Sequence, residues 1–358
     1  MRIMMVITGM KSGGAERVMA TLCNELSKEH EVQLSILKSQ NSDYYLSPKI
    51  KVVGGNIHHK NFFKSIYFIK REIENKKPDI ILSFMTKSNI VALVAKELSK
   101  YKVPVIIAER ANPHNTSKII SLIRKYIYQK ADGCVFQTKW AQEYYKNILK
   151  CESVIIKNPL TPEFKVEKYN GPKKQKIVCT ARLSKEKNQK LLINAFNIIK
   201  DKYPNYKVEI YGEGPLRETL KNQIETLNLQ NSVFLMGRKK NIQKHIKEAE
   251  IFVLPSNSEG MPNALLEAMA LGLACISTDC PIGGPAIIIN NNENGILIPM
   301  EDAEIMAAKI EKLIIDREFA KKIGENARKV INDFETVKVC KEWEKYLKSV
   351  KQKKESRK

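Results

Sequence analysis

The stretch AEIFVLPSNSEGMPNALLEAMALG, residues 249–272, contains one full unit of the pattern that decides the fold. Its apolar run at residues 251–254 is typical of a buried β-strand, and the Pro, Ser, Asn and Gly that follow are typical of a loop. Pro262 then fits the first turn of a helix, which we expect to run to about Leu271 and to end at Gly272. A strand, a loop and a helix in this order form the repeating unit of a parallel sheet with crossover helices.

The same alternation runs through both halves of the chain. In the first half, helix-length amphipathic stretches separate the short apolar runs RIMMVIT (2–8), VQLSIL (32–37), DIILSF (79–84), PVIIAE (104–109), GCVFQT (133–138) and SVIIKN (153–158). In the second half the runs are KIVCTARLS (176–184), KVEIYGEG (207–214), SVFLMG (232–237), AEIFVLPSNSEG (249–260), LACISTD (273–279) and NGILIP (294–299). Residues 157–176 are rich in Pro, Lys and Asn, so we place a linker there. The sequence therefore predicts the α/β class, with two Rossmann-like, doubly wound domains that face each other across a cleft, at residues 1–163 and 164–335.

The composition is that of a globular protein. Of the 358 residues, 43% are hydrophobic and 28% are charged, and no apolar run approaches the roughly 18 residues that a membrane-spanning helix needs. The seven Cys residues lack CxxC spacing, so we expect reduced thiols in a cytoplasmic protein. The five His residues are not spaced as metal ligands, so a structural zinc is not expected.

The net charge of +22 is concentrated in the first half of the chain and at its end. Residues 1–163 carry 26 basic and 14 acidic side chains, a balance of +12, and residues 345–358 carry 7 and 1, a balance of +6. This charge suits anionic lipid, nucleic acid or phosphorylated substrates, or it reflects only Lys residues on solvated faces. Because the chain shows neither aromatic stacking positions nor a recognised nucleic-acid-binding module, we do not expect a nucleic-acid partner.

The loop after the first predicted strand contains Gly13 and Gly14 and leads into a helix that starts near Ala15. Paired glycines let the backbone approach a ligand closely, and the N-terminus of a helix favours negative charge. The loop is not a GxGxxG fingerprint, so it gives little support to an NAD site. A plain structural turn is the alternative interpretation.

Two cations follow the first predicted strand of the second half. Arg182 and Lys187 lie five residues apart on a strand-to-helix loop, and Asn188 fits the N-cap of the helix that follows. Two fixed cations at this position suit a diphosphate. The alternative is a pair of exposed basic side chains without a ligand.

The two carboxylates of the opening stretch, Glu259 and Glu267, raise the question of a glycosidase dyad. Glu259 lies on the loop, and Glu267 lies in the predicted helix, where a rise of about 1.5 Å per residue places it about 8 Å beyond Pro262. A retaining glycosidase holds its two carboxyl groups only about 5 to 5.5 Å apart. The spacing therefore favours two contacts to one extended ligand, and an ordinary helix-surface position for Glu267 is the alternative.

Four segments together, SGGAERV (12–18), ARLSKEKN (181–188), YGEGPLR (211–217) and EGMPNALLEAMALG (259–272), resemble glycosyltransferase family 4. This family consists of retaining glycosyltransferases with the two-domain GT-B fold. The resemblance covers nearly the whole chain, and its most specific element is the E-x7-E spacing of Glu259 and Glu267. Within the family, the chain looks most similar to enzymes that extend lipid-linked oligosaccharides, including bacterial N-acetylgalactosamine transferases of glycan assembly.

The resemblance implies a role for each matching residue. Arg182 and Lys187 match the cationic pair that holds the donor diphosphate and stabilises it as it leaves. Glu259 matches the residue at the donor sugar that is needed for turnover, and Glu267 matches the residue that binds the nucleotide ribose. Further contacts to the nucleotide sugar are implied for the backbone of Gly260, Met261, Pro262 and Asn263, for Gly13 and Gly14 from the first domain, and for Arg238 at the base.

The resemblance also implies the reaction and its partners. We expect transfer of a hexose or N-acetylhexosamine, with retention, from a nucleotide diphosphate sugar to a polyprenyl-diphosphate-linked saccharide, with UDP favoured over GDP or ADP by its prevalence in the family. Because the sequence lacks a D-x-D motif and Arg182 and Lys187 supply positive charge, we expect no metal and no other cofactor. The alternative is an enzyme of the same fold that uses a soluble acceptor, or an epimerase.

One position departs from the family pattern. Many relatives have a His that contacts the donor sugar, whereas this chain has Arg110 at the matching position and His114 four residues later. Both residues are therefore candidates for a sugar or acceptor contact.

Two basic amphipathic stretches of the first half suggest a membrane surface as a further partner. Residues 58–71 place Phe62, Ile66 and Ile69 on one helical stripe flanked by Lys and Arg, and residues 118–130 are similar. The alternative is that both stripes pack on the sheet, as the apolar faces of crossover helices do. On the membrane interpretation, we expect peripheral binding at the inner face of the cell membrane.

The end of the chain is predicted to differ from the segment before it. The resemblance implies that a helix at residues 336–349 crosses back onto the first domain. Residues 350–358 are basic and lack periodic apolar side chains after Val350, so we expect a frayed, solvated tail.

Overall fold

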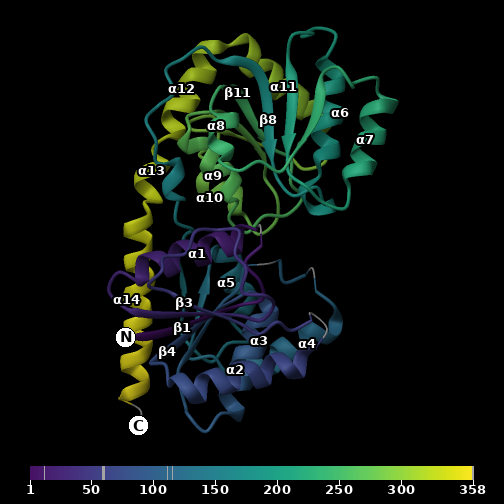
Figure 1. The fold of residues 1–358 in the computed structure, drawn as a ribbon. Helices are drawn as coiled ribbons and strands as arrows, with labels where there is room; N and C mark the ends of the chain where they lie inside the picture. Colours follow the sequence, from purple (N-terminus) through teal and green to yellow (C-terminus); the bar gives the residue numbers. More distant parts are fainter. Residues whose placement is uncertain (12, 59–60, 111, 115, 357–358) are drawn as a thin grey trace. The chain divides into compact units, whose positions relative to one another are not determined.

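The computed structural model describes residues 1–11, 13–58, 61–110, 112–114 and 116–356 (Figure 1). The chain folds into two compact units: the first consists of Met1–Pro159 and Thr336–Lys358, and the second of Leu160–Glu335. The chain thus passes into the second unit just before the boundary expected after residue 163. Each unit contains one parallel β-sheet with helices, so the predicted α/β class with two Rossmann-like sheets is confirmed.

The first unit is built on a seven-stranded parallel sheet with the order β3-β2-β1-β4-β5-β6-β7. The strands are β1 (Arg2–Ile7), β2 (Glu31–Ile36), β3 (Lys51–Gly54), β4 (Ile80–Phe84), β5 (Val105–Ala108), β6 (Gly133–Phe136) and β7 (Ser153–Ile155). The helices are α1 (Gly14–Leu26), α2 (Phe62–Lys76), α3 (Thr86–Leu98), α4 (Lys118–Ile127), α5 (Lys139–Tyr145) and α14 (Thr336–Glu355), and a 3-10 turn spans Tyr128–Lys130. The strand order reverses between β1 and β4, and ligands of such sheets bind at the carboxyl ends of the strands beside this reversal.

Helix α14, yellow in Figure 1, completes the core of the first unit. Trp343 is fully buried, and its ring centroid lies 5.6 Å from that of Phe84 at the end of β4. Val339, Leu347 and Val350 are buried in the same cluster, and α14 contacts α1. These apolar side chains hold α14 against the first sheet, although the helix lies far from the sheet strands in sequence.

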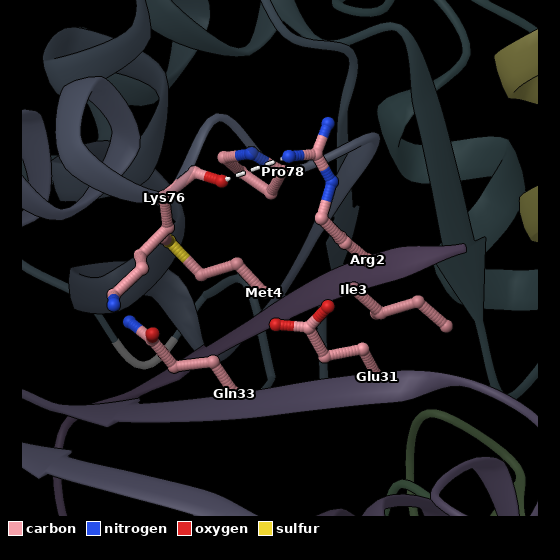
Figure 2. Close-up of a pocket in the computed structure, with 7 residues that line it drawn as sticks. All are labelled: Arg2, Ile3, Met4, Glu31, Gln33, Lys76 and Pro78. Carbon is pink, nitrogen blue, oxygen red and sulfur yellow. Dashed lines mark hydrogen bonds between the residues drawn. The ribbon is translucent and has the colours of Figure 1, made fainter.

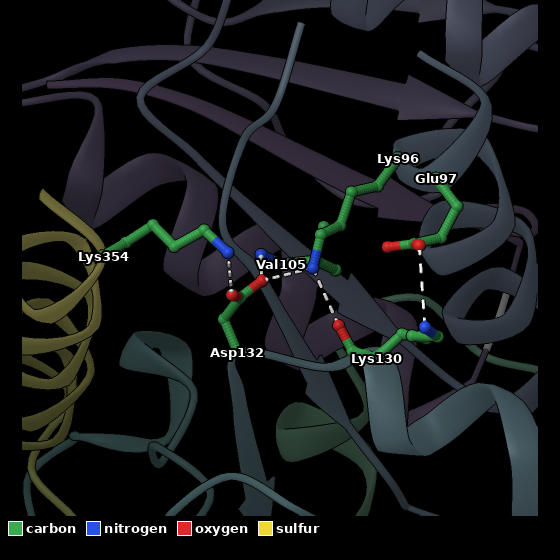
Figure 3. A network of polar contacts seen from close by, with 6 residues as sticks. All are labelled: Lys96, Glu97, Val105, Lys130, Asp132 and Lys354. Atoms are coloured by element: carbon green, nitrogen blue, oxygen red, sulfur yellow. Dashed lines mark hydrogen bonds and ion pairs between the residues drawn. The ribbon is translucent and has the colours of Figure 1, made fainter. Parts of the chain in front are cut away.

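The expectation of a frayed tail from residue 350 is wrong, because α14 continues to Glu355. Val350 packs in the core, and Lys351 Nζ lies 3.8 Å from a carboxylate oxygen of Asp79. Lys354 Nζ donates a hydrogen bond to Asp132 Oδ1 at 2.9 Å (Figure 3). The turns after Val350 are therefore held by ion pairs rather than by a periodic apolar face, and residues 357 and 358 lie outside the described residues.

The second unit contains a six-stranded parallel sheet with the order β10-β9-β8-β11-β12-β13. The strands are β8 (Lys174–Thr180), β9 (Lys207–Tyr211), β10 (Val233–Gly237), β11 (Ala249–Leu254), β12 (Ala274–Thr278) and β13 (Ile296–Ile298). The helices are α6 (Gln189–Ile199), α7 (Arg217–Thr226), α8 (Ile242–Ile246), α9 (Asn263–Ala270), α10 (Gly284–Ile288), α11 (Ala303–Ile315), α12 (Arg317–Ala327) and α13 (Val330–Asp333), with 3-10 turns at Pro162–Phe164 and Lys185–Lys187. Here the strand order reverses between β8 and β11, which marks the expected ligand edge of this sheet.

The opening stretch of the sequence forms β11, a loop and α9, as predicted. The helix begins at Asn263, with Pro262 at the N-cap position, so it starts one residue later than expected. It ends at Ala270, and Gly272 follows with a φ of +75°, a left-handed conformation that glycine adopts without strain. Because β11 is buried on both faces, the strand appears in the sequence as a continuous apolar run.

None of the helices in the described residues is long and apolar enough to cross a bilayer.

Candidate functional site

Three loops meet at the carboxyl ends of β8, β9 and β11 in the second unit. The amide of Leu183 donates to the Glu213 carbonyl at 3.1 Å, and the amide of Asn257 donates to the Glu186 carbonyl at 2.8 Å. The motifs ARLSKEKN, YGEGPLR and SEGMP are therefore neighbours in space, at the edge where the sheet order reverses.

The two glycines of YGEG are required by this loop packing. Gly212 has a φ of +149°, and a Cβ at this position would lie 1.9 Å from the Ala181 carbonyl oxygen. A Cβ on Gly214 would lie 2.2 Å from the Leu183 carbonyl oxygen. These glycines allow the loop after β9 to pack against the loop after β8, which carries the predicted cations.

Glu259 and Lys187 form the central contact of the site. Lys187 Nζ donates a hydrogen bond to Glu259 Oε1 at 2.6 Å, and the fully buried Ser256 donates its hydroxyl to the same oxygen at 2.7 Å. Thr278, at the end of β12, donates its hydroxyl to the Ser256 carbonyl. Sequence reasoning placed Glu259 and Lys187 in one site but missed Ser256 and Thr278, whose only signal is that each is a hydroxyl residue at or just beyond the end of a buried strand.

Arg182 differs from Lys187 in its surroundings. Its side chain is exposed and makes no hydrogen bond within the described residues, while its carbonyl accepts a hydrogen bond from Gln189 Nε2 at 2.9 Å. The backbone of Arg182 is thus fixed, and its guanidinium faces solvent. An exposed cation on a fixed loop suits an anionic ligand.

Asn188 does not form the predicted N-cap. It occupies the position before α6 with a left-handed φ of +44°, and its side chain makes no capping hydrogen bond. Instead, Asn188 Nδ2 donates to Asn257 Oδ1 at 2.9 Å. The side chain therefore joins the loops after β8 and β11 rather than satisfying the helix end.

Glu267 is buried in α9 and has a different partner from Glu259. Its Oε1 accepts a hydrogen bond from the Thr161 hydroxyl at 3.4 Å. Burial rules out the alternative of an ordinary residue on an exposed helix surface.

The loop between β11 and α9 also carries the other predicted contacts of the second unit. Met261 and Pro262 are buried, and Asn263 is the first residue of α9. A Cβ on Gly284, the first residue of α10, would lie 1.6 Å from the Gly260 carbonyl oxygen, so the two loops touch through backbone atoms. Arg238 directly follows β10 and is exposed.

Gly13 and Gly14 lie in the first unit, at the start of α1. Gly13 occupies the N-cap position with extended backbone, and Tyr44 contacts it twice: the Gly13 amide donates to the Tyr44 hydroxyl, and that hydroxyl donates to the Gly13 carbonyl, both at 2.9 Å. A Cβ on Gly13 would lie 2.1 Å from Glu16 Oε2. The carboxylate of Glu16, which sequence reasoning did not single out, thus lies where a side chain at position 13 would begin, and Ser12 lies outside the described residues.

Arg110 and His114, also in the first unit, have separate environments. Arg110 follows β5, donates a hydrogen bond to Asn158 Oδ1, and places its guanidinium 4.6 Å above the centre of the Phe84 ring. Burial lowers the pKa of Arg110, and the charge of Glu16 opposes that shift. His114 is exposed and lies edge-on to Tyr144, with ring centroids 5.0 Å apart. Only Arg110 lies at the carboxyl end of a strand, the edge at which ligands of such sheets bind.

The two predicted membrane stripes differ in their exposure to solvent. In α2, Ile66 and Ile69 are buried, so this stripe faces the interior of the first unit and the membrane interpretation of the stripe is wrong, although Phe63 and Tyr67 of the same helix are exposed. Lys60 beside it lies outside the described residues. In α4, Ile119, Leu122 and Tyr126 are exposed by 72%, 58% and 62%. Helix α4 therefore presents an apolar face to solvent.

A shallow hollow lies at the opposite, amino-terminal edge of the first sheet (Figure 2). It is lined by Arg2, Ile3, Met4, Glu31, Gln33, Lys76 and Pro78. None of these residues belongs to a predicted motif, and the hollow is at the edge away from the carboxyl ends of the strands. Within the described residues, no group of three or more His, Cys, Asp or Glu is arranged to hold a metal.

Two family models and several known proteins match this chain. Residues 12–164 match the family described as Glycosyltransferase Family 4, and residues 162–330 match the family described as Glycosyl transferases group 1. A Campylobacter jejuni protein named as a GalNAc-alpha-(1->4)-GalNAc-alpha-(1->3)-diNAcBac-PP-undecaprenol alpha-1,4-N-acetyl-D-galactosaminyltransferase is 29% identical over 362 residues, which cover 98% of this chain and 99% of that protein. An uncharacterized glycosyltransferase of Methanocaldococcus jannaschii is 31% identical over 332 residues, 78% of this chain and 82% of that protein.

A solved structure of the Anabaena protein HepE in complex with UDP superposes with a TM-score of 0.79 at 17% identity, and the match covers 98% of this chain and all of that one. This likeness shows a shared GT-B fold.

Proposed function

The chain belongs to glycosyltransferase family 4, and we propose that it moves a hexose or N-acetylhexosamine, with retention, from a UDP-sugar to a lipid-linked saccharide in the assembly of a cell-surface glycan. The observation that carries this proposal is the 2.6 Å contact between Lys187 and Glu259 at the ligand edge of the second sheet. It places a cation suited to a leaving phosphate directly beside a carboxylate suited to sugar hydroxyls.

In this reaction, positive charge from the protein stabilises the leaving diphosphate. Lys187 and the exposed Arg182 supply that charge, in the place where a metal ion serves enzymes with a D-x-D motif. We propose a metal-independent reaction in which the acceptor attacks from the side of the leaving group and the leaving phosphate takes the acceptor's proton. Glu259 as a covalent nucleophile is the less favoured route.

Glu259 and Glu267 then hold two parts of one donor. Both described hydrogen bonds of the Glu259 carboxylate go to Oε1, so Oε2 is available to a sugar hydroxyl. Glu267 is assigned to the ribose and Arg238 to the base. The backbone from Gly260 to Asn263 is assigned to the sugar and phosphates, and Gly13 and Gly14 are assigned to the diphosphate.

A polyprenyl-diphosphate-linked acceptor is supported by the relatives. The Campylobacter protein above is named for an undecaprenol-linked saccharide, and a second protein from the same organism, 28% identical over 95% of this chain, is named in the same way. Arg110 and His114 remain the candidates for contact with the acceptor or the sugar. An acceptor of this kind lies in a membrane, so the enzyme must reach a bilayer surface.

Helix α4 supports peripheral binding at the inner face of the cell membrane. Its exposed Ile119, Leu122 and Tyr126 lie among Lys118 and Lys125, which are also exposed. An apolar face with flanking cations suits an anionic bilayer surface. Flotation with liposomes that contain anionic lipid tests this: we expect binding at low salt, and protein that stays at the bottom of the gradient would refute it.

The donor and the reaction are tested together. Thermal shifts with UDP-, GDP- and ADP-sugars identify the nucleotide, and mass spectrometry with a polyprenyl-diphosphate-linked acceptor then identifies the product. A lengthened acceptor is the expected result. Isomerisation of the donor alone would instead identify an epimerase, and transfer only to a soluble sugar would replace the lipid-linked acceptor.

A further inference from the structure

Lys187 and Glu259 neutralise each other in the second unit. Lys187 Nζ donates to Glu259 Oε1 at 2.6 Å, although the proposed function needs the lysine at the donor diphosphate and the carboxylate at the donor sugar. Two anions, the carboxylate and the phosphate, therefore compete for one ammonium group.

We propose that Glu259 is the counter-ion of Lys187, and that the donor diphosphate binds by drawing Lys187 away and so releases the carboxylate to the donor sugar. This inference rests on the proposed function and adds an order of events to it. The diphosphate is bound before Glu259 Oε1 becomes available to a sugar hydroxyl, so a sugar without a nucleotide can engage only Oε2.

The two side chains differ in their freedom to move. The Lys187 side chain is 24% exposed, while that of Glu259 is 8% exposed. Lysine carries its charge on a flexible four-carbon stem with three rotatable donors, so Lys187 can turn toward a new anion while its backbone stays in place. Glu259 is enclosed and stays where it is.

Ser256 and Thr278 are the positioning residues of this exchange. The buried Ser256 hydroxyl donates to Glu259 Oε1 at 2.7 Å, and the Thr278 hydroxyl holds the Ser256 carbonyl from the end of β12. When Lys187 leaves, Ser256 still donates to the carboxylate. Glu259 therefore keeps its position and one hydrogen bond until a sugar hydroxyl supplies another.

The exchange has a measurable cost for a diphosphate that carries no sugar. UDP takes Lys187 but offers Glu259 nothing in return, so a buried carboxylate loses a charged hydrogen bond without replacement. Gln at position 259 has nearly the same size and no charge to hold Lys187. Glu259→Gln should therefore raise the affinity for UDP, by about tenfold if one charge-assisted hydrogen bond is no longer lost.

The test is calorimetric titration of the full-length chain with UDP and with UMP. Glu259→Gln should bind UDP about tenfold more tightly than the wild type and UMP less than twofold more tightly, because UMP lacks the second phosphate, which carries the sugar in the donor. Glu186→Gln is the matched control, since it removes one negative charge from the residue beside Lys187, and it should change UDP affinity less than twofold. In a Lys187→Met background, the gain from Glu259→Gln should disappear.

Ser256→Ala separates positioning from general packing. With the serine donor gone, Glu259 depends on Lys187 alone, so UDP affinity should fall several-fold in the wild type and stay unchanged in the Glu259→Gln background. A fall in both backgrounds would show a structural role only and would overturn the assignment of Ser256. Unchanged or weaker UDP binding by Glu259→Gln, or an equal gain in Glu186→Gln, would overturn the exchange itself. If wild-type protein binds none of UDP, GDP and ADP, the proposed function fails and the inference with it, whereas UDP binding without the gain refutes the inference alone.

Discussion

Replacing Asp132 with Asn removes the negative charge that holds the end of α14 against the rest of the first unit. Asp132 Oδ2 accepts hydrogen bonds from Lys96 Nζ at 2.7 Å and from the Val105 amide at 2.9 Å, and Oδ1 accepts one from Lys354 Nζ at 2.9 Å (Figure 3). The Lys96 side chain is only 7% exposed. Asp132→Asn therefore leaves a buried ammonium group without its counter-ion.

The expected loss follows from these contacts. Removing one partner of a fully buried ion pair costs about 3–5 kcal/mol. The cost here is smaller because Lys354 is partly exposed and because Lys96 keeps a hydrogen bond to the Lys130 carbonyl at 2.7 Å. We expect a loss of about 2–3 kcal/mol in the free energy of unfolding of the first unit. At about 2–4 °C per kcal/mol, the melting temperature should fall by roughly 5–10 °C.

Scanning calorimetry and urea unfolding measure this loss. The control is Glu97→Gln, because Glu97 pairs with Lys130 at 3.9 Å on the surface and should contribute less than about 0.5 kcal/mol. If the Asp132→Asn variant is as stable as the wild type, the role of this network is refuted. If its free energy of unfolding falls only as much as that of Glu97→Gln, the network contributes no more than a surface ion pair.

The same network predicts a pH dependence. Burial raises the pKa of Asp132, but the charge of Lys96 and the hydrogen bonds from Lys96, Lys354 and the Val105 amide outweigh burial, so the pKa is lowered overall. A carboxyl whose folded-state pKa lies below its unfolded value, about 3.9, adds stability above that value and loses it as the pH falls through the folded pKa. The difference between wild type and Asp132→Asn should stay constant from about pH 5 to 8 and shrink below about pH 4. A difference that grows toward acid pH would contradict this reasoning.

Three further predictions concern the site and the membrane surface. Glu259→Gln should lower kcat by about 10²–10⁴ while UDP still binds, and Glu267→Ala should weaken UDP binding about tenfold in calorimetry; the reverse pattern would exchange the two assignments. Arg182→Gln should lower kcat/KM by about 10²–10³ with an unchanged melting temperature, because its exposed guanidinium makes no hydrogen bond within the described residues; an unchanged kcat/KM would remove Arg182 from the reaction. Leu122→Glu should abolish flotation with anionic liposomes, whereas Ile198→Glu, the same kind of change at a 55% exposed position of the second unit, should not.

The fold and the position of the site could be predicted because each depends on local patterns. Strands buried on both faces of a parallel sheet appear as continuous apolar runs, and loops with Gly and Pro follow them. Since the carboxyl ends of parallel strands meet at one edge, residues as distant as Lys187 and Glu259 could be assigned to one site from their places in the chain. The structure adds that they touch, at 2.6 Å.

The errors have a common physical origin, which is that a side chain can choose a distant partner over a local one. Asn188 was expected to cap its own helix, but its amide bonds Asn257 in another loop. The end of α14 was expected to fray for want of apolar residues, but Lys354 reaches Asp132 in the first unit. Sequence rules that consider only neighbouring residues predict the local hydrogen bond. They do not include a distant partner, which becomes a neighbour only when the chain folds.

An amphipathic pattern does not by itself predict which face of a helix is buried, as α2 and α4 show. Their sequences are similar, yet α2 buries apolar side chains and α4 buries a charged one. In α4 the buried side chain is Arg124, which donates to the Tyr145 hydroxyl at 2.7 Å and to the Pro113 carbonyl at 2.8 Å. A buried guanidinium needs such partners, and once they are present the helix turns Arg124 inward. Leu122 and its neighbours then face solvent, whereas in α2 the apolar Ile69 occupies the interior. The apolar surface proposed for the membrane is therefore a consequence of polar contacts inside the first unit.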